Sequence, residues 1–166
     1  TKTKINIMVL KGNSSRGLLG TTLGFFFGFA AVALYGPTAI KFKEAMGLTP
    51  ALLGLLIAIP SLSGSLLRIP FGAWVDTTGG RKPFLILMLL SLVGLGGVTF
   101  LLHTSYPDNM TGMYGLILLF GALSGCGIAT FSVGIGQTSY WFPRKKQGMA
   151  LGTFAGIGNL APGIFS

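Results

Sequence analysis

A single arginine, Arg68, interrupts the apolar run of residues 51–75. If this run is helical, Arg68 lies about 12 Å inside the end marked by Asp76, at ~1.5 Å per residue. A charged side chain at such a depth costs about 3 kcal/mol or more when it faces lipid. Three interpretations follow: the guanidinium lines a water-filled cavity, snorkels to the interface, or pairs with a buried carboxylate.

The residues around Arg68 favour the cavity. Small and polar residues recur at the i, i+3, i+4 and i+7 spacing and share one helical face. This face consists of Ser61, Gly64, Ser65, Arg68 and Gly72. The three carboxylates of the chain, Glu44, Asp76 and Asp108, lie in or beside expected loops, which disfavours an internal ion pair. A mobile anion could fill that role, and the flat guanidinium suits carboxylate, nitrate or phosphate.

Two other residues bear on this cavity. Phe131 lies among small residues in the run 113–138, where it serves either core packing or a flat apolar wall. Asn159 can donate to an anion or bridge two helices, and Pro162 after it is expected to kink the helix. Glycines spaced by four precede Asn159 and predict a ridge for close helix packing. These glycines are Gly148, Gly152 and Gly156.

The composition predicts the helices that position these residues. Hydrophobic residues make up 51% of the 166 residues and charged residues 9%, so a soluble globule is excluded. We expect an all-α membrane protein with about five spans, because five apolar runs are long enough to cross a bilayer. The expected spans are residues 18–40, 51–75, 83–103, 113–138 and 147–166.

Several other functions are disfavoured. The net charge of +9 does not indicate nucleic acid as a partner, because the basic residues sit between the apolar runs. The single cysteine, Cys126, and the single histidine, His103, have no other potential metal ligands near them in the sequence. The sequence also contains no nucleophile–base pair and no phosphate-binding loop. We therefore expect neither an enzyme nor a metal or cofactor, and membrane lipids as the surrounding partner.

The basic residues predict orientation. Nine of them fall on the side of the N-terminus and two on the other, which places the N-terminus in the cytoplasm. The fifth run is still apolar at Ser166, so we expect residues 1–166 to be the N-terminal half of a longer bundle. A C-terminal half of the same protein would then be its partner.

The stretch "GAWVDTTGGRK" (residues 72–82) resembles the signature loop of the major facilitator superfamily. The resemblance implies a superfamily-type helix bundle in which Gly72, Asp76 and Arg81 act in a conformational gate. One additional glycine, Gly80, departs from the commonest spacing of that loop.

The stretch "GIATFSVGIGQTSYWFPRKKQGMALGTFAGIGNLAPG" (residues 127–163) looks like the nitrate signature of the nitrate/nitrite porter family. The resemblance implies that Arg68, Phe131 and Asn159 bind nitrate or nitrite. The first-helix aromatic of that family falls on Phe29 or Tyr35, and the second arginine belongs to the C-terminal half.

The implied mechanism is alternating access in a bacterial inner membrane, by nitrate/nitrite antiport or nitrate/proton symport. The absence of a buried carboxylate or histidine near Arg68 favours exchange. Three alternatives remain open: a superfamily transporter of another small anion, an anion channel, and a membrane scaffold or sensor without flux.

Overall fold

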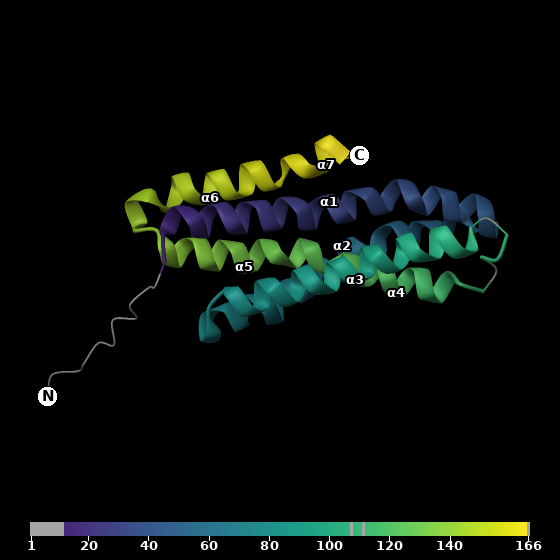
Figure 1. Ribbon diagram of the computed structural model, residues 1–166, viewed down its shortest axis with the longest axis horizontal. Helices are drawn as coiled ribbons and strands as arrows, with labels where there is room; N and C mark the ends of the chain where they lie inside the picture. The colour runs from purple at the N-terminus through teal and green to yellow at the C-terminus, as the bar shows by residue number, and fades with distance from the viewer. Residues whose placement is uncertain (1–11, 107, 111, 166) are drawn as a thin grey trace, which may run out of the picture.

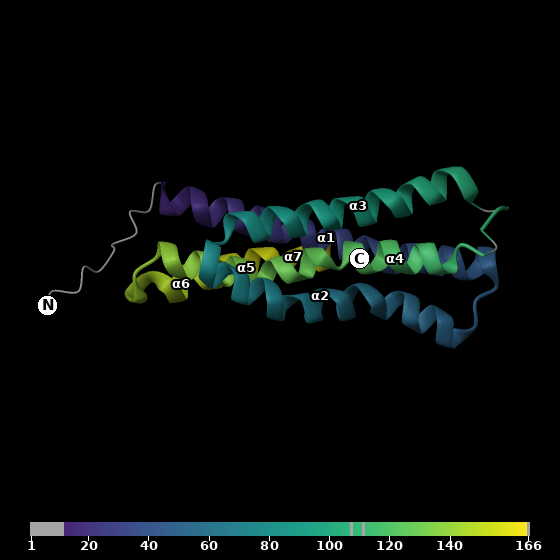
Figure 2. The ribbon, with the colours of Figure 1, turned by 90° about the horizontal axis from the view of Figure 1, so that it is seen from below.

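A computed structural model describes residues 12–106, 108–110 and 112–165, which form an elongated bundle of helices (Figures 1 and 2). The helices are α1 (Ser14–Met46), α2 (Pro50–Thr78), α3 (Arg81–Ser105), α4 (Tyr114–Ser124), α5 (Cys126–Trp141), α6 (Arg144–Gly158) and α7 (Leu160–Phe165). They provide five stretches long and apolar enough to cross a membrane. The prediction of an all-α membrane bundle with about five spans is therefore confirmed.

Polar residues set the helix ends slightly beyond the predicted apolar runs. The Asn13 side chain accepts a hydrogen bond from the Ser15 amide at 2.9 Å and caps α1. The same helix ends at Gly47, whose φ of +60° suits a residue without a side chain. Thr49 caps α2 in the same way as Asn13 caps α1, and Pro50 occupies the first helical turn.

The span that holds Phe131 occupies the centre of the bundle. α5 packs against α1, α2 and α3, while α4 packs against α2 and α3 (Figure 2). This span is one predicted run but two helices, because α4 ends at Ser124 and α5 begins at Cys126. At Gly125 between them, an added Cβ would collide with the Pro60 carbonyl of α2, so only glycine allows this approach.

Side chains from neighbouring helices bind the carbonyls near this break. The Ser63 hydroxyl donates to the Ala122 carbonyl at 2.7 Å, and the Ser91 hydroxyl donates to the Ser124 carbonyl at 3.1 Å. Buried carbonyls without partners would destabilise an apolar bundle. These serines therefore tie α2 and α3 to the central span where it is interrupted.

The two ends of the bundle differ in charge. The start of α1, the α2–α3 turn and the α5–α6 turn share one end, which we call the basic end (Figure 1). It carries Arg16, Arg81, Lys82, Arg144, Lys145 and Lys146. Lys2, Lys4 and Lys11, which also enter the predicted orientation, lie outside the described residues.

Candidate functional site

Arg68 is positioned by a close seam between α2 and α5. One turn before Arg68, Gly64 packs against Gly125 and Ile128, and a Cβ added at Gly64 would lie only 2.7 Å from the Ile128 Cβ. One turn after Arg68, a Cβ added at Gly72 would lie 3.9 Å from the Ser132 Cβ. Because residues four apart lie on one helical face, Arg68 falls between these contacts and must face α5.

The Arg68 side chain meets Phe131 across this seam. Its guanidinium carbon lies 5.3 Å from the centroid of the Phe131 ring, within the range of a cation–π contact. Its Nε is buried and has no hydrogen-bond partner among the described residues. The residue as a whole is half-buried, about ten residues or ~15 Å from the end of α2 at Thr78. A buried donor without a partner is costly, and an anion would satisfy it.

The predicted cavity around Arg68 is not one of the three described cavities. All three lie at the basic end, and Arg68 lines none of them. The stripe predicted to surround Arg68 is also not uniformly open: Ser61 and Ser65 are exposed, but Gly64 is buried in the seam with α5.

Phe131 belongs to a cluster of four phenylalanines. Its ring stacks on Phe154 of α6, with centroids 5.7 Å apart and planes 19° apart. Phe25 of α1 lies tilted against both rings, at 5.1 Å from Phe131 and 5.3 Å from Phe154. Phe29 stacks on Phe25 at 5.5 Å. The sequence pointed to Phe131 but not to Phe25 or Phe154, because a phenylalanine in an apolar run does not show which residues of other helices it will contact.

The two first-helix aromatics occupy different surroundings. Tyr35 is 1% exposed in the core cluster at the end opposite the basic one, and its hydroxyl donates to the Ile117 carbonyl at 3.0 Å. Phe29 is half-buried and lies one ring away from Phe131. The geometry therefore associates Phe29, rather than Tyr35, with the aromatic cluster.

Asn159 lies at the interruption between α6 and α7. Its side-chain amide donates to the Ala155 carbonyl of its own helix at 2.7 Å, and the residue is exposed. Pro162 has no backbone N–H for the helix, which accounts for a break at this point. The preceding Gly158 packs directly against the Phe25 ring. Asn159 is thus next to the aromatic cluster, but its amide is hydrogen-bonded within α6 and not to Arg68.

The glycine ridge of α6 faces away from the other described helices. An added Cβ at Gly148, Gly152 or Gly156 would meet no atom within 4 Å. The helix instead contacts α1 and α5 through Phe154 and Gly158. Packing on this ridge remains a prediction, and it would have to involve a surface outside the described chain.

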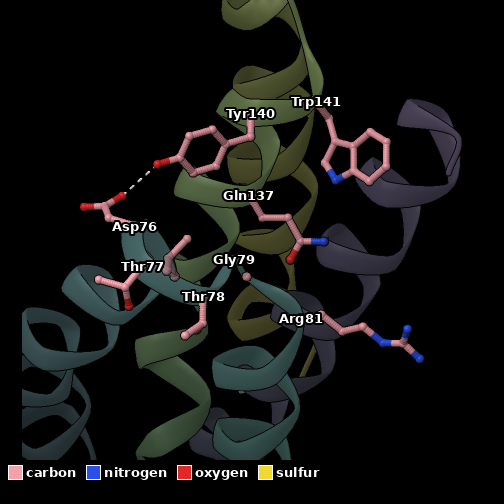
Figure 3. Close-up of a pocket in the computed structure, with 10 residues that line it drawn as sticks. Asp76, Thr77, Thr78, Gly79, Arg81, Gln137, Tyr140 and Trp141 are labelled. Carbon is pink, nitrogen blue, oxygen red and sulfur yellow. Dashed lines mark hydrogen bonds between the residues drawn. The ribbon is translucent and has the colours of Figure 1, made fainter. Parts of the chain in front are cut away.

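Two of the three predicted gate residues, Asp76 and Arg81, line a cavity of about 350 Å³ at the basic end, whereas Gly72 lies in the seam with α5 (Figure 3). The Tyr140 hydroxyl of α5 donates to the Asp76 carboxylate of α2 at 3.0 Å. Arg81 lines the same cavity, but its side chain extends away from Asp76 toward α1 (Figure 3). Sequence reasoning missed Tyr140, because nothing in its spacing links it to Asp76.

Cys126 and His103 do not belong to a cluster of reactive or metal-binding side chains among the described residues. Cys126 is buried with a free thiol, and His103 lies at the end of α3. Across residues 12–106, 108–110 and 112–165, no group of histidine, cysteine and acidic residues could hold a metal ion.

Together, the apolar spans and the Arg68–Phe131 pair describe an integral membrane protein with an unusual charge inside the bundle. Residues 21–166 match the family model of the Major Facilitator Superfamily, and the chain belongs to this family.

Individual relatives narrow the comparison. The chain is 33% identical over 144 residues to the "Probable nitrate/nitrite antiporter NarK1" of Thermus thermophilus, covering 87% of this chain and 30% of the relative. It is 30% identical over 155 residues to the "Nitrate/nitrite transporter NarU" of Salmonella typhimurium, covering 93% of this chain and 32% of the relative. It is 31% identical over 157 residues to the "Probable nitrate transporter NarT" of Staphylococcus carnosus, covering 93% and 38%.

These relatives support the family prediction made from the motifs. Their names describe transporters rather than enzymes, as predicted for this chain. The chain spans about a third of the length of each relative.

Proposed function

We propose that this chain is the N-terminal half of a transporter that moves nitrate, nitrite or both across the membrane by alternating access. The single observation that carries the proposal is the Arg68 guanidinium over the Phe131 ring, with a buried Nε that has no partner among the described residues. The relatives named for nitrate and nitrite transport support the same substrate class.

The chemistry of this pair suits a flat, monovalent anion. The guanidinium supplies coplanar N–H donors for two oxygens, and the ring supplies a flat apolar surface beside them. Nitrate and nitrite are small, planar and weakly hydrated, so they lose little when they leave water for such a site. Phe29 and Asn159 are proposed to complete the wall from α1 and from the α6–α7 break.

The rest of the binding site is proposed to lie in a C-terminal half with a second arginine. The two halves would rock about a site near the membrane centre, so the surface around Arg68 would face a cavity shared between them. Gly148, Gly152 and Gly156 would give the other half a smooth contact surface. Gly72, Asp76 and Arg81 would act at the basic end, which we propose faces the cytoplasm of a bacterial cell.

Exchange of nitrate for nitrite is the coupling that we propose. Glu44 and Asp76 lie in the last turns of α1 and α2, Asp108 lies in the α3–α4 loop, and His103 lies at the end of α3. None of these groups is near Arg68, so the described residues include no proton carrier at the site. A proton symporter would need that carrier from the other half.

Reconstituted transport tests the proposal. The full-length protein is placed in liposomes, and uptake of ¹⁵N-nitrate is followed with nitrite, nitrate or buffer inside. Antiport predicts rapid uptake only with an internal anion, whereas symport predicts uptake driven by an inward proton gradient. Absence of nitrate and nitrite uptake under both conditions, or an unsaturable current typical of a channel, would overturn the proposal.

A further inference from the structure

The phenylalanine cluster behind Phe131 is more constrained than a core contact requires. Phe25, Phe131 and Phe154 come from α1, α5 and α6, and their ring centroids form a triangle with sides of 5.1, 5.3 and 5.7 Å. Phe154 is 0% exposed and Phe25 is 2% exposed, while Phe131 is only half-buried. The buried rings of Phe25 and Phe154 therefore pack behind Phe131, and the Phe131 ring stays partly exposed.

Two glycines make room for these buried rings. An added Cβ at Gly134 would collide with the Phe154 ring, and an added Cβ at Gly158 would collide with the Phe25 ring. Each glycine lies on the helix opposite the ring that it accommodates, since Gly134 belongs to α5 and Gly158 to α6. The three helices thus approach closely enough for the three rings to pack directly against one another.

We propose that Phe154 is a positioning residue for anion selectivity, acting through Phe131. Its near-parallel stack at 19° fixes the plane of the Phe131 ring, and Phe25 prevents that ring from tilting. A ring held in one plane beside Arg68 fits a flat anion and excludes a tetrahedral one by shape. This inference rests on the proposed function, because it concerns the same anion site.

Loss of the Phe154 ring should therefore change selectivity more than transport capacity. In Phe154→Leu the apolar volume is largely kept, but the stacking surface under Phe131 is lost. We expect the half-saturation concentration for nitrate to rise about three- to tenfold, the size expected if the contribution of the Phe131–Phe154 pair to positioning is lost. We expect perchlorate, which is also monovalent and weakly hydrated but tetrahedral, to become a correspondingly better competitor.

The control and a compensating variant separate positioning from packing. Phe120→Leu alters another ring that packs on a glycine, Gly97, but at the α3–α4 contact away from Arg68. The double variant Phe154→Leu with Gly134→Ala refills part of the space that the Phe154 ring occupied. The measurements are ¹⁵N-nitrate uptake into proteoliposomes, perchlorate competition, and thermal unfolding of the full-length protein.

The outcomes are distinct. Positioning predicts that Gly134→Ala restores the unfolding temperature of Phe154→Leu but not the preference for nitrate, and that Phe120→Leu leaves the preference unchanged. Selectivity that is unchanged in Phe154→Leu, or that returns together with stability in the double variant, would overturn the inference while leaving nitrate transport intact. A wild-type protein that transports no nitrate would overturn the proposed function and, with it, this inference.

Discussion

Replacing Arg68 by lysine tests whether the guanidinium shape, rather than its charge, is what the site needs. Arg68→Lys keeps the positive charge in the α2–α5 seam, so insertion and folding should be preserved. The ammonium group loses the flat pair of donors and the guanidinium surface that lies 5.3 Å from the Phe131 centroid. The variant therefore removes geometry and leaves electrostatics in place.

The size of the effect follows from what is lost. One charge-assisted hydrogen bond to the anion contributes about 1.5–3 kcal/mol, and the exchange of a planar cation for a compact one weakens the contact with the ring. A loss of about 2–3 kcal/mol corresponds to a rise of about 30- to 140-fold in the half-saturation concentration for nitrate. High-affinity uptake should then disappear at micromolar nitrate and return in part at millimolar nitrate.

The assay compares Arg68→Lys with Arg144→Lys in the same proteoliposomes. Arg144 is exposed at the start of α6 and lines none of the three described cavities, so its variant should transport like wild type. Protein amount in the vesicles is measured for both. If Arg68→Lys keeps a half-saturation concentration within about twofold of wild type, the guanidinium does not hold the anion and the proposed site is wrong.

Three further variants test other parts of the account. Phe131→Ala should lower the preference for nitrate over perchlorate, and equal losses for both ions in competition assays would indicate packing damage instead. Tyr140→Phe removes the hydrogen bond to Asp76 and should lower the maximal uptake rate by about two- to tenfold at unchanged half-saturation, as one such bond contributes about 0.5–1.5 kcal/mol. Gly125→Val should lower the thermal stability strongly, because its side chain would collide with the Pro60 carbonyl, and an unchanged unfolding temperature would contradict that contact.

The sequence was most informative where a residue contradicts its surroundings. The five spans follow from long apolar runs, and Arg68 stands out because a charge inside such a run needs a reason. Even so, the sequence did not predict which helix Arg68 faces. That choice depends on the glycines at positions 64 and 125, which let α2 approach α5 closely enough for the guanidinium to reach the Phe131 ring.

Features made of ordinary apolar residues could not be predicted in the same way. Phe25 and Phe154 are residues of a type common in any membrane-protein core. Only their contacts with the Phe131 ring distinguish them from other phenylalanines. The helix break at Gly125 could not be predicted from the sequence either, because glycine is also common in membrane helices that continue without interruption. The contact of Tyr140 with Asp76 joins residues 64 positions apart, a distance over which no periodicity carries information.

The glycines show most directly how position gives the same residue different roles. The rings of Phe154 and Phe25 fill the space where side chains at Gly134 and Gly158 would lie. A side chain at Gly148 or Gly156 would meet no described atom within 4 Å. All four belong to the stretch that resembles the nitrate signature. Some of its glycines thus shape the interior of the described bundle, and others leave a smooth outer surface. Substitution of Gly134 or Gly158 by alanine should therefore disturb packing within the described bundle. Substitution of Gly148 or Gly156 should matter only where another surface packs against them.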